Sequence, residues 1–489
     1  MIFNRLIALL AIVVLISCSR KCGVVGDGKT LNTAALQHVI DECSSAGGGT
    51  VSLPAGEYLT GTLYLKSNVT LNLEKGAVLR GSRNPADYPE KGRRKALIFA
   101  EDASNIALTG EGEIYGSGDA FVQFNNAPDR PVLVQFFDCS NLTVKNIKMA
   151  ESAFWTCRLV RCDGVDVSGV SIVSHTNWNN DGFNIESRNV VITDCTVDTD
   201  DDALCFKSED PDFVVENITV SKCRLQSNCN FIKFGTASAG GFRNIRISDC
   251  QLSQCSQSRY RFWEKTVPGV TQTVTGIAGI ALEVVDGGFM EDIHISDITM
   301  QDVQTPVFVR LGKRKTSDNT YLKNAVIENI TATSASFIAS SVTGVPSLKV
   351  ANITFRNFDL RLKAGGKSAD ANLDVPEKEA NYPENRMFGV MLPAYGFYLR
   401  HADNLLFDNI KLSYFGDLKE ERHAIVADDV TNLTVANAVL QSPESPLPVF
   451  LFRDCRAIDL SQGVICAGFQ VKLYEAINTP DSEIKWIDF

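Results

Sequence analysis

Short runs of alternating apolar and polar residues recur along the chain, each introduced by Asn, Gly or Asp. The repeated runs are Asn141-Leu-Thr-Val, Gly164-Val-Asp-Val, Asn189-Val-Val-Ile, Asn217-Ile-Thr-Val, Asn244-Ile-Arg-Ile and Asp292-Ile-His-Ile. A period of two rich in Val, Ile and Thr indicates β-strands, and the residues between the runs indicate turns. The unit returns roughly every 23 to 28 residues, within the range of stacked solenoids. We therefore predict an all-β solenoid in which one unit forms one coil.

Helical periodicity is almost absent, with one exception near the N-terminus. Apolar residues fall at helical spacing between Thr33 and Cys43, behind Asn32 and Thr33 as possible N-caps. A solenoid end exposes apolar side chains and needs a cap. We expect a short amphipathic helix to cover the first coil.

One elongated domain is the simplest organisation for 489 residues, because a solenoid grows without splitting. Two polar stretches interrupt the coil pattern, and loops of that length are usually functional or disordered. The expected segments are a signal peptide at 1–18, a cap and first coil at 19–66, a β-helix domain at 67–465 with insertions at about 256–275 and 364–386, and a C-terminal end at 466–489.

The first residues are typical of a targeting segment. Arg5 precedes an apolar run from Leu6 to Ile16 that is short for a membrane span. Leu15-Ile16-Ser17-Cys18 is similar to a bacterial lipobox, which predicts cleavage before Cys18 and acylation of its sulfur. An ordinary secretory signal is the alternative. In both cases we expect export, to the periplasm or the outer membrane, with membrane contact only through the N-terminal lipid.

Most of the fourteen cysteines are not arranged as disulfide partners. Five of them recur at nearly the coil period, which predicts small apolar residues stacked inside the solenoid: Cys139, Cys162, Cys195, Cys223 and Cys250. Cys22 and Cys43 are the most plausible disulfide. No pair of C-x-x-C spacings indicates zinc, and we predict neither a metal nor a cofactor.

The net charge of −11 argues against nucleic acid and anionic membrane surfaces as partners. It also repels an acidic polysaccharide, so such a substrate would need a local basic patch. Lys207 and Lys233, on consecutive coils, are candidates. A second basic cluster follows a later strand: Arg310, Lys313, Arg314 and Lys315.

Two acidic stretches lie one repeat apart, Asn179-Asn180-Asp181-Gly182 and Asp200-Asp201-Asp202-Ala203. On neighbouring coils they would face one patch of solvent, since adjacent strands lie about 4.8 Å apart. Alone, the first is a turn signal and the second a solvated loop or calcium site. Together they favour catalysis, because inverting glycoside hydrolysis uses two carboxyl groups about 6.5–9.5 Å apart. Crowded carboxylates cannot all ionise cheaply, so we expect at least one raised pKa.

The sequence resembles glycoside hydrolase family 28, the polygalacturonases and their relatives, from about residue 24 to about 310. The likeness rests on Val25-Gly26-Asp27-Gly28-Lys29, Asn32-Thr33-Ala34-Ala35, the coils, Asn179 to Gly182, and Asp201-Asp202 followed by Ala203-Leu204-Cys205-Phe206-Lys207-Ser208. The resemblance implies a right-handed parallel β-helix that hydrolyses an α-glycosidic bond in pectic polysaccharide or oligosaccharide with inversion. It also implies that Asp201 is the general acid and that Asp181 with Asp202 activates the water.

Two departures from the family concern substrate recognition. Asn230 stands where the family usually has the His of Gly-His-Gly, and Ala281 and Glu283 stand where it has an Arg-x-Lys pair that grips a uronate. Glu in place of Lys should repel galacturonate. We therefore expect an enzyme other than a standard endo-polygalacturonase. The candidate substrate-binding residues are Asn180, Lys207, Asn230, Lys233, Glu283, Arg310 as a replacement cation, and His175 and Trp178 before Asp181; for His175, a hydrogen-bonded turn residue is the favoured alternative.

Two other functions fit the same scaffold. A calcium-dependent pectate lyase would use the aspartates as metal ligands, and a Lys or Arg would remove the proton α to a carboxylate. A glycan-binding protein without activity would keep only the solenoid. The presence of Asp181, Asp201 and Asp202 together ranks the binding protein last.

Overall fold

The computed structural model describes residues 23–90, 94–121, 129–315, 319–468 and 472–486. The predicted signal segment with Cys18, and Cys22 of the predicted disulfide, lie outside these residues, so export, the lipid anchor and that disulfide stay predictions. In the described part of the chain, no helix has the length and apolar character needed to cross a membrane.

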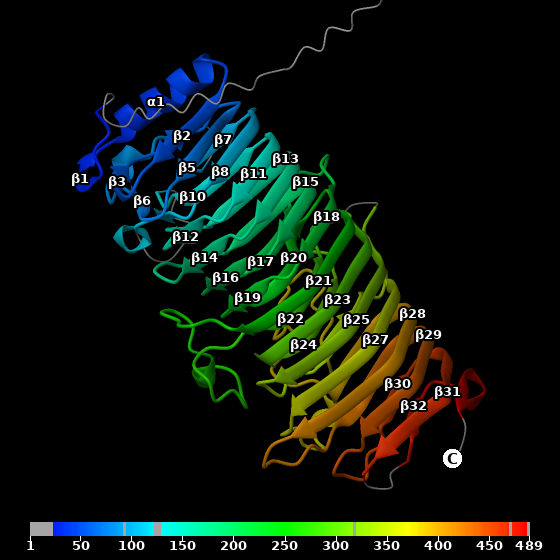
Figure 1. Cartoon of the computed structure of the whole chain (residues 1–489). Helices are drawn as coiled ribbons and strands as arrows, with labels where there is room; N and C mark the ends of the chain where they lie inside the picture. Colours follow the sequence, from blue (N-terminus) through cyan, green and yellow to red (C-terminus); the bar gives the residue numbers. More distant parts are fainter. Residues whose placement is uncertain (1–22, 91–93, 122–128, 316–318, 469–471, 487–489) are drawn as a thin grey trace, which may run out of the picture.

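The chain forms a right-handed parallel β-helix, as predicted, and the coils stack into one long rod (Figure 1). Each coil contributes strands to three faces, and every strand pairs in parallel with the equivalent strand of the next coil. Long strands bend through a corner and belong to two or three faces.

Face 1, which carries the site described below, consists of β4 (Leu63–Tyr64), β7 (Ala96–Glu101), β10 (Val132–Phe137), β13 (Cys157–Ser168), β15 (Phe183–Thr193), β17 (Leu204–Ser208), β20 (Asn230–Ser238), β22 (Ala278–Val284), β24 (Thr305–Leu311), β26 (Ser340–Thr343), β28 (Ala394–Phe415), β29 (His423–Gln441), β30 (Phe450–Arg453) and β32 (Tyr474–Ile477). Face 2 adds β2 (Gly49–Leu53), β5 (Val69–Leu73), β8 (Ser104–Thr109), β11 (Ser140–Lys145), β18 (Val215–Ser221), β21 (Phe242–Gln254), β23 (Phe289–Val303), β25 (Tyr321–Ser334), β27 (Val350–Lys363), β31 (Arg456–Ala467) and β33 (Ile484–Trp486). Face 3 adds β1 (Asp27–Leu31), β3 (Gly56–Thr60), β6 (Ala77–Gly81), β9 (Glu113–Tyr115), β12 (Lys148–Ala150), β14 (Ser171–Ser174), β16 (Thr196–Thr199) and β19 (Arg224–Ser227).

The core is a set of aliphatic columns that run along the rod. One column contains the apolar residue that follows the Asn or Asp of each repeat, and its members pair in register: Val190, Ile218, Ile245 and Ile293. All four are almost fully buried. Burial of a side chain of this size stabilises the fold by about 1.5–3 kcal/mol, so the alternation in the sequence records which side chains point inward. The five periodic cysteines are also buried and free, as predicted.

Helix α1 (Thr33–Ser45) covers the first coil, which confirms the predicted cap (Figure 1). Leu36, Val39 and Ile40 face the open end and are buried. Asn32 occupies the N-cap position, but its side chain accepts from the Val25 amide at 2.8 Å instead of capping the helix. Asn32 is therefore the N-cap residue, one of the two candidates, but its side chain binds the incoming chain and makes no capping hydrogen bond.

The Asn residues that introduce the repeats turn the chain at a corner and form a ladder along it. Asn189, Asn217 and Asn244 all have left-handed backbones, with φ of 55°, 57° and 49°. Nδ2 of Asn217 donates to Oδ1 of Asn189 at 3.1 Å, and Nδ2 of Asn244 donates to Oδ1 of Asn217 at 2.8 Å. Asn tolerates this conformation better than most residues, which explains why the repeat begins with it.

Asn217→Ala should lower the free energy of unfolding by about 1–3 kcal/mol, because it combines left-handed strain with the loss of two ladder hydrogen bonds. Asn217→Gly is the matched control, since Gly accepts the left-handed backbone and loses only the ladder. We expect the Gly variant to be the more stable of the two in urea denaturation. Equal midpoints for both variants would show that the backbone conformation at this corner contributes nothing.

Candidate active site

A cavity of about 520 Å³ opens on face 1 near the middle of the rod. Its lining comes from the turns that precede β13, β15 and β17, from β17 and β20, from the segment after β24, and from both predicted insertions. The principal lining residues are Trp155, Asp181, Asp201, Asp202, Lys207, Asn230, Lys233, Arg261, Trp263, Arg314, Tyr382, Glu384 and Arg386. The structure therefore brings together all three predicted acids and three of the predicted substrate-binding residues.

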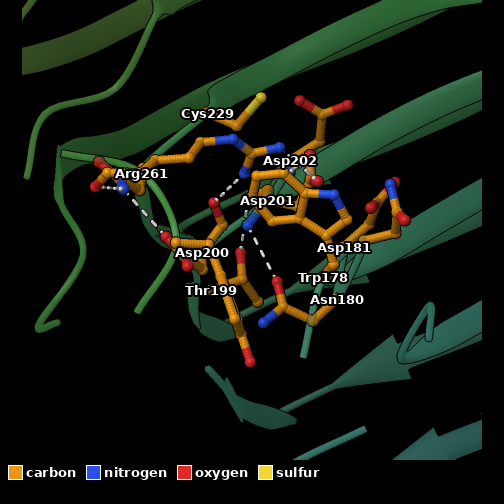
Figure 2. A network of polar contacts seen from close by, with 12 residues as sticks. Trp178, Asn180, Asp181, Thr199, Asp200, Asp201, Asp202, Cys229 and Arg261 are labelled. Atoms are coloured by element: carbon orange, nitrogen blue, oxygen red, sulfur yellow. Dashed lines mark hydrogen bonds and ion pairs between the residues drawn. The ribbon is translucent and has the colours of Figure 1, made fainter. Parts of the chain in front are cut away.

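Hydrogen bonds between coils fix the positions of the acids. The Gly182 amide, directly after Asp181, donates to the carbonyl of Asp202 at 2.9 Å. Oδ1 of Asn180 accepts from the Asp201 amide at 2.9 Å, and its Nδ2 donates to the carbonyl of Ser174 at 2.7 Å. Asn180 is fully buried. It therefore positions the Asp201 turn (Figure 2), and it is not among the residues that line the cavity.

Asp202 is held as a carboxylate by donors from the next coil. Nζ of Lys233 lies 3.1 Å from Oδ2, and Nδ2 of Asn230 donates to Oδ1 at 2.7 Å. Burial alone raises the pKa of Asp202, but the charges of Lys233 and Lys207 and the Asn230 hydrogen bond outweigh it, so the pKa lies well below the usual Asp value. Asn230, which departs from the family pattern, thus contacts an acid directly.

Asp181 has the opposite environment. Burial, followed by the negative charge of Asp201, raises its pKa to about 7, although Nζ of Lys207 lies 3.7 Å away and opposes the shift. The expected raised pKa in the acidic cluster is therefore present. It falls on Asp181, whereas the resemblance places the donated proton on Asp201.

Asp201 is paired with Arg261, a residue that the sequence analysis missed. Nη2 of Arg261 lies 2.8 Å from Oδ2 of Asp201, and Nη1 donates to the carbonyl of Asp200 at 2.6 Å (Figure 2). Arg261 belongs to the insertion between β21 and β22, far from Asp201 along the chain. The only sequence signal was its place among aromatic residues in that insertion.

His175 and Trp178 lie beside the cavity in different ways. His175 is fully buried, and its Nε2 lies 3.1 Å from Oδ1 of Asp198, so it is a structural turn residue, the favoured alternative for it. Trp178 is half-buried, and the Arg261 guanidinium lies 4.8 Å from its ring centroid. Trp178 supports the cation that faces Asp201 (Figure 2).

Glu283 lies beneath the cavity surface. It is 1% exposed, and its Oε2 accepts from Oγ1 of Thr236 at 3.2 Å. Burial raises the pKa of Glu283 to about 7, although the Lys233 charge opposes the shift. Below that pH the carboxyl is mostly neutral, so the predicted repulsion of a uronate by Glu283 is weak.

Arg310 requires a correction, since it does not reach the cavity. Its side chain is 1% exposed, and its Nη atoms donate to the carbonyl of Gly344 at 2.7 Å and to that of Glu377 at 2.8 Å. It holds the insertion between β27 and β28 from behind. Arg314, four residues later in the same basic cluster, does line the cavity and is paired with Asp286.

The insertion between β27 and β28 forms one wall of the cavity. The sequence analysis predicted this insertion but did not identify the residues in it that line the cavity. The Tyr382 hydroxyl lies 3.3 Å from Nζ of Lys233, and Arg386 pairs with Glu384 at 2.9 Å. On the other side of the acids, Nζ of Lys207 lies 4.9 Å from the Trp155 ring centroid. Aromatic rings beside paired charges suit a sugar, whose faces are apolar and whose edges are polar.

Two sets of candidate ligands around the acids have atoms within 4.8 Å of one another: Asp181 with Asp202 and Cys205, and Asp201 with Asp202 and Cys229. Calcium takes six to eight oxygen ligands. Each carboxylate here already faces a Lys or Arg cation, and a thiol completes each set. The arrangement suits chemistry by protonation better than calcium coordination.

Comparison with known proteins gives a consistent family. The sequence model of Glycosyl hydrolases family 28 matches residues 43–380. A "Probable polygalacturonase" of Vitis vinifera is 27% identical over 388 residues, which are 71% of this chain and 74% of that protein. An "Exo-poly-alpha-D-galacturonosidase" of Dickeya chrysanthemi is 42% identical over 113 residues, 20% of this chain and 18% of that protein. The solved exopolygalacturonase of Thermotoga maritima shares the fold, with a TM-score of 0.62 and 21% identity over 81% of this chain and 90% of that one.

The raised pKa of Asp181 predicts a specific pH dependence of stability. Between the ordinary Asp value of about 4 and about 7, folded Asp181 holds a proton that the unfolded chain has lost, so its contribution makes stability fall as pH rises. Above about 7 the contribution is constant, at no more than roughly 4 kcal/mol. Asp181→Asn has no carboxyl to titrate at this position and so avoids the fall in stability. In urea denaturation, the free energy of unfolding of the variant minus that of the native protein should therefore rise between about pH 4 and about pH 7.

Lys207→Met is the companion variant for this titration. It removes the cation 3.7 Å from Asp181, so the pKa of Asp181 should rise further and the pH window should extend upward. A stability difference between Asp181→Asn and the native protein that stays constant across the window would contradict the assignment.

Proposed function

The chain belongs to glycosyl hydrolases family 28, and from this premise we propose that it hydrolyses an α-linked bond in pectic oligosaccharide with inversion, and not as a standard endo-polygalacturonase. Membership and the polygalacturonase relatives make it a glycosidase that acts on pectin. The observation that carries the mechanism is the cluster of three carboxyl groups in one cavity, where burial raises the pKa of Asp181 while the charges of Lys233 and Lys207 outweigh burial and lower that of Asp202.

Asp202 is suited to act on the attacking water. Its low pKa keeps it ionised over the working range, and one of its oxygen atoms lies within 4.8 Å of one from Asp181. A water between these two groups could lose its proton to Asp202 as it attacks the sugar carbon. Lys233 and Asn230 keep Asp202 from taking a proton too early.

Asp201 is the proposed general acid. It borders the same cavity on the side of the insertion between β21 and β22. In the reaction its proton passes to the leaving oxygen while the water attacks from the opposite face, so two separate carboxyl groups share the work. An acid in this position suits a bond whose leaving group is a sugar hydroxyl.

The walls of the cavity support the departure from endo action. A long polymer needs an open groove, whereas here residues of both insertions, including Trp263 and Tyr382, border the space beside the acids. The Ala281 position, where the family has a cation, is fully buried. We propose that a chain end or a short oligosaccharide is the substrate.

A calcium-dependent lyase on the same fold is disfavoured by the cations that already face the acids. A lyase would release an unsaturated product that absorbs in the ultraviolet and would lose activity in chelator. A hydrolase gives a saturated product whether or not chelator is present.

Asp201→Asn should lower hydrolysis of pectic oligosaccharides by at least 10²-fold, because general acid help is worth about 10²–10⁴ in rate. Thermal stability should change little. Asp212→Asn, an exposed carboxyl outside the cavity, is the control and should retain native activity. Native turnover by Asp201→Asn would remove Asp201 from the mechanism.

Proton NMR of the first product should show the anomer opposite to that of the substrate bond, because the water attacks the face opposite the leaving group. The spectrum must be recorded before mutarotation equilibrates the anomers. Retention would mean that one of the acids is a nucleophile, and the assignment of Asp181 and Asp202 to the water would be wrong.

A further inference from the structure

Arg261 is the cavity cation whose partner must carry a proton before the proposed reaction begins. It reaches from the insertion between β21 and β22 to Asp201 at 2.8 Å. Its side chain is 18% exposed and that of Asp201 is 9% exposed, so the pair lies at the cavity surface. The ring of Trp178 supports the guanidinium at 4.8 Å, a contact that attracts cations.

This pair conflicts with the role of Asp201 as a general acid. A guanidinium at hydrogen-bond distance is a partner for a carboxylate, whereas a general acid must carry a proton. The other groups around Asp201 are the carboxyls of Asp181, Asp200 and Asp202, the Cys229 thiol from the next coil and, further away, the Arg130 guanidinium. Arg261 is the side-chain cation within hydrogen-bond distance of Asp201, and the Asp202 amide also donates to Oδ1 of Asp201, at 2.9 Å.

The remaining cavity cations keep their partners when the substrate binds. Lys207 lies 3.7 Å from Asp181, and Lys233 faces Asp202, which stays ionised until the water attacks. Arg314 and Arg386 are paired with Asp286 and Glu384, which have no role in the chemistry. When Asp201 takes up a proton, Arg261 alone among these loses its anion, while its contacts with Trp178 and the Asp200 carbonyl still hold it at the cavity.

We propose that Arg261 exchanges one carboxylate for another: it is paired with Asp201 in the free enzyme and with the carboxylate of a substrate uronic acid in the complex. The inference rests on the proposed function and names its substrate class. The planar guanidinium that fits Asp201 fits a uronate equally well, since both present a carboxylate. In this chain, Arg261 of the insertion thus takes the place of the cations that the family has at the positions of Ala281 and Glu283.

The exchange couples binding to protonation. As the uronate pairs with Arg261, Asp201 takes one proton from solvent and becomes the acid. That proton passes to the leaving oxygen, the water adds its hydroxyl to the sugar carbon, and its second proton goes to Asp202 and then to solvent. When the product leaves, Arg261 returns to the ionised Asp201. A neutral sugar cannot replace Asp201 in this way, so it should be a poor substrate.

The test compares a galacturonate oligosaccharide with its methyl ester, which keeps the sugar and removes the charge. Native enzyme should prefer the free acid. Arg261→Met should lower kcat/KM on the free acid by about 10²-fold, as expected for one truncated partner of a charge pair, and should change hydrolysis of the ester far less. Arg261→Lys should recover part of the loss. Arg259→Met, an exposed Arg in the same insertion, is the matched control and should behave as native.

The difference between the acid and the ester separates this role from support of the fold, because a variant with a damaged fold loses activity on both substrates alike. Equal losses on acid and ester, or no loss on either, would overturn the exchange while leaving the glycosidase intact. If native enzyme cleaves neither substrate nor any other pectic oligosaccharide, the proposed function itself fails. A variant that melts early is replaced by Arg261→Gln, to which the same comparison applies.

Discussion

The parallel register between coils is the constraint on which the rest of the structure depends. Each residue lies about 4.8 Å from the equivalent residue of the next coil, so any side chain repeated in the sequence becomes a column in space. The aliphatic core and the Asn ladder at the corner both follow from this rule. The same rule brings two acidic turns together, because Gly182 after Asp181 pairs with Asp202.

The stacked acidic turns bring negative charges close together, and cations from two parts of the chain neutralise them. The strands that follow the turns supply Lys207 and Lys233, one coil apart, and these face Asp181 and Asp202. The third acid, Asp201, is paired with Arg261 from an insertion. Protonation within the cluster therefore depends both on the regular coils and on a segment outside them.

The insertions form walls of the cavity that the stacked strands do not provide. A segment outside the ladder lacks inter-strand hydrogen bonds, and its buried carbonyls need other donors. Between β27 and β28 these donors are arginines: the buried Arg310 and Arg422 donate to Glu377 and Leu392, and the half-buried Arg400 donates to Val375. The regular coils thus hold the irregular wall in place, and Tyr382 reaches Lys233 as a result.

The repeat pattern by itself determined the coil, the inward side chains, the capping helix and the meeting of Asp181 with Asp201 and Asp202, because each is a local or one-coil relation that periodicity encodes. It did not determine that Asp201 faces Arg261, that Arg310 lies behind the wall, or that Glu283 lies beneath the cavity. These relations depend on where two long insertions fold back, and no period in the sequence records that. Contacts between distant segments are set by packing in three dimensions, and only the tertiary structure decided them.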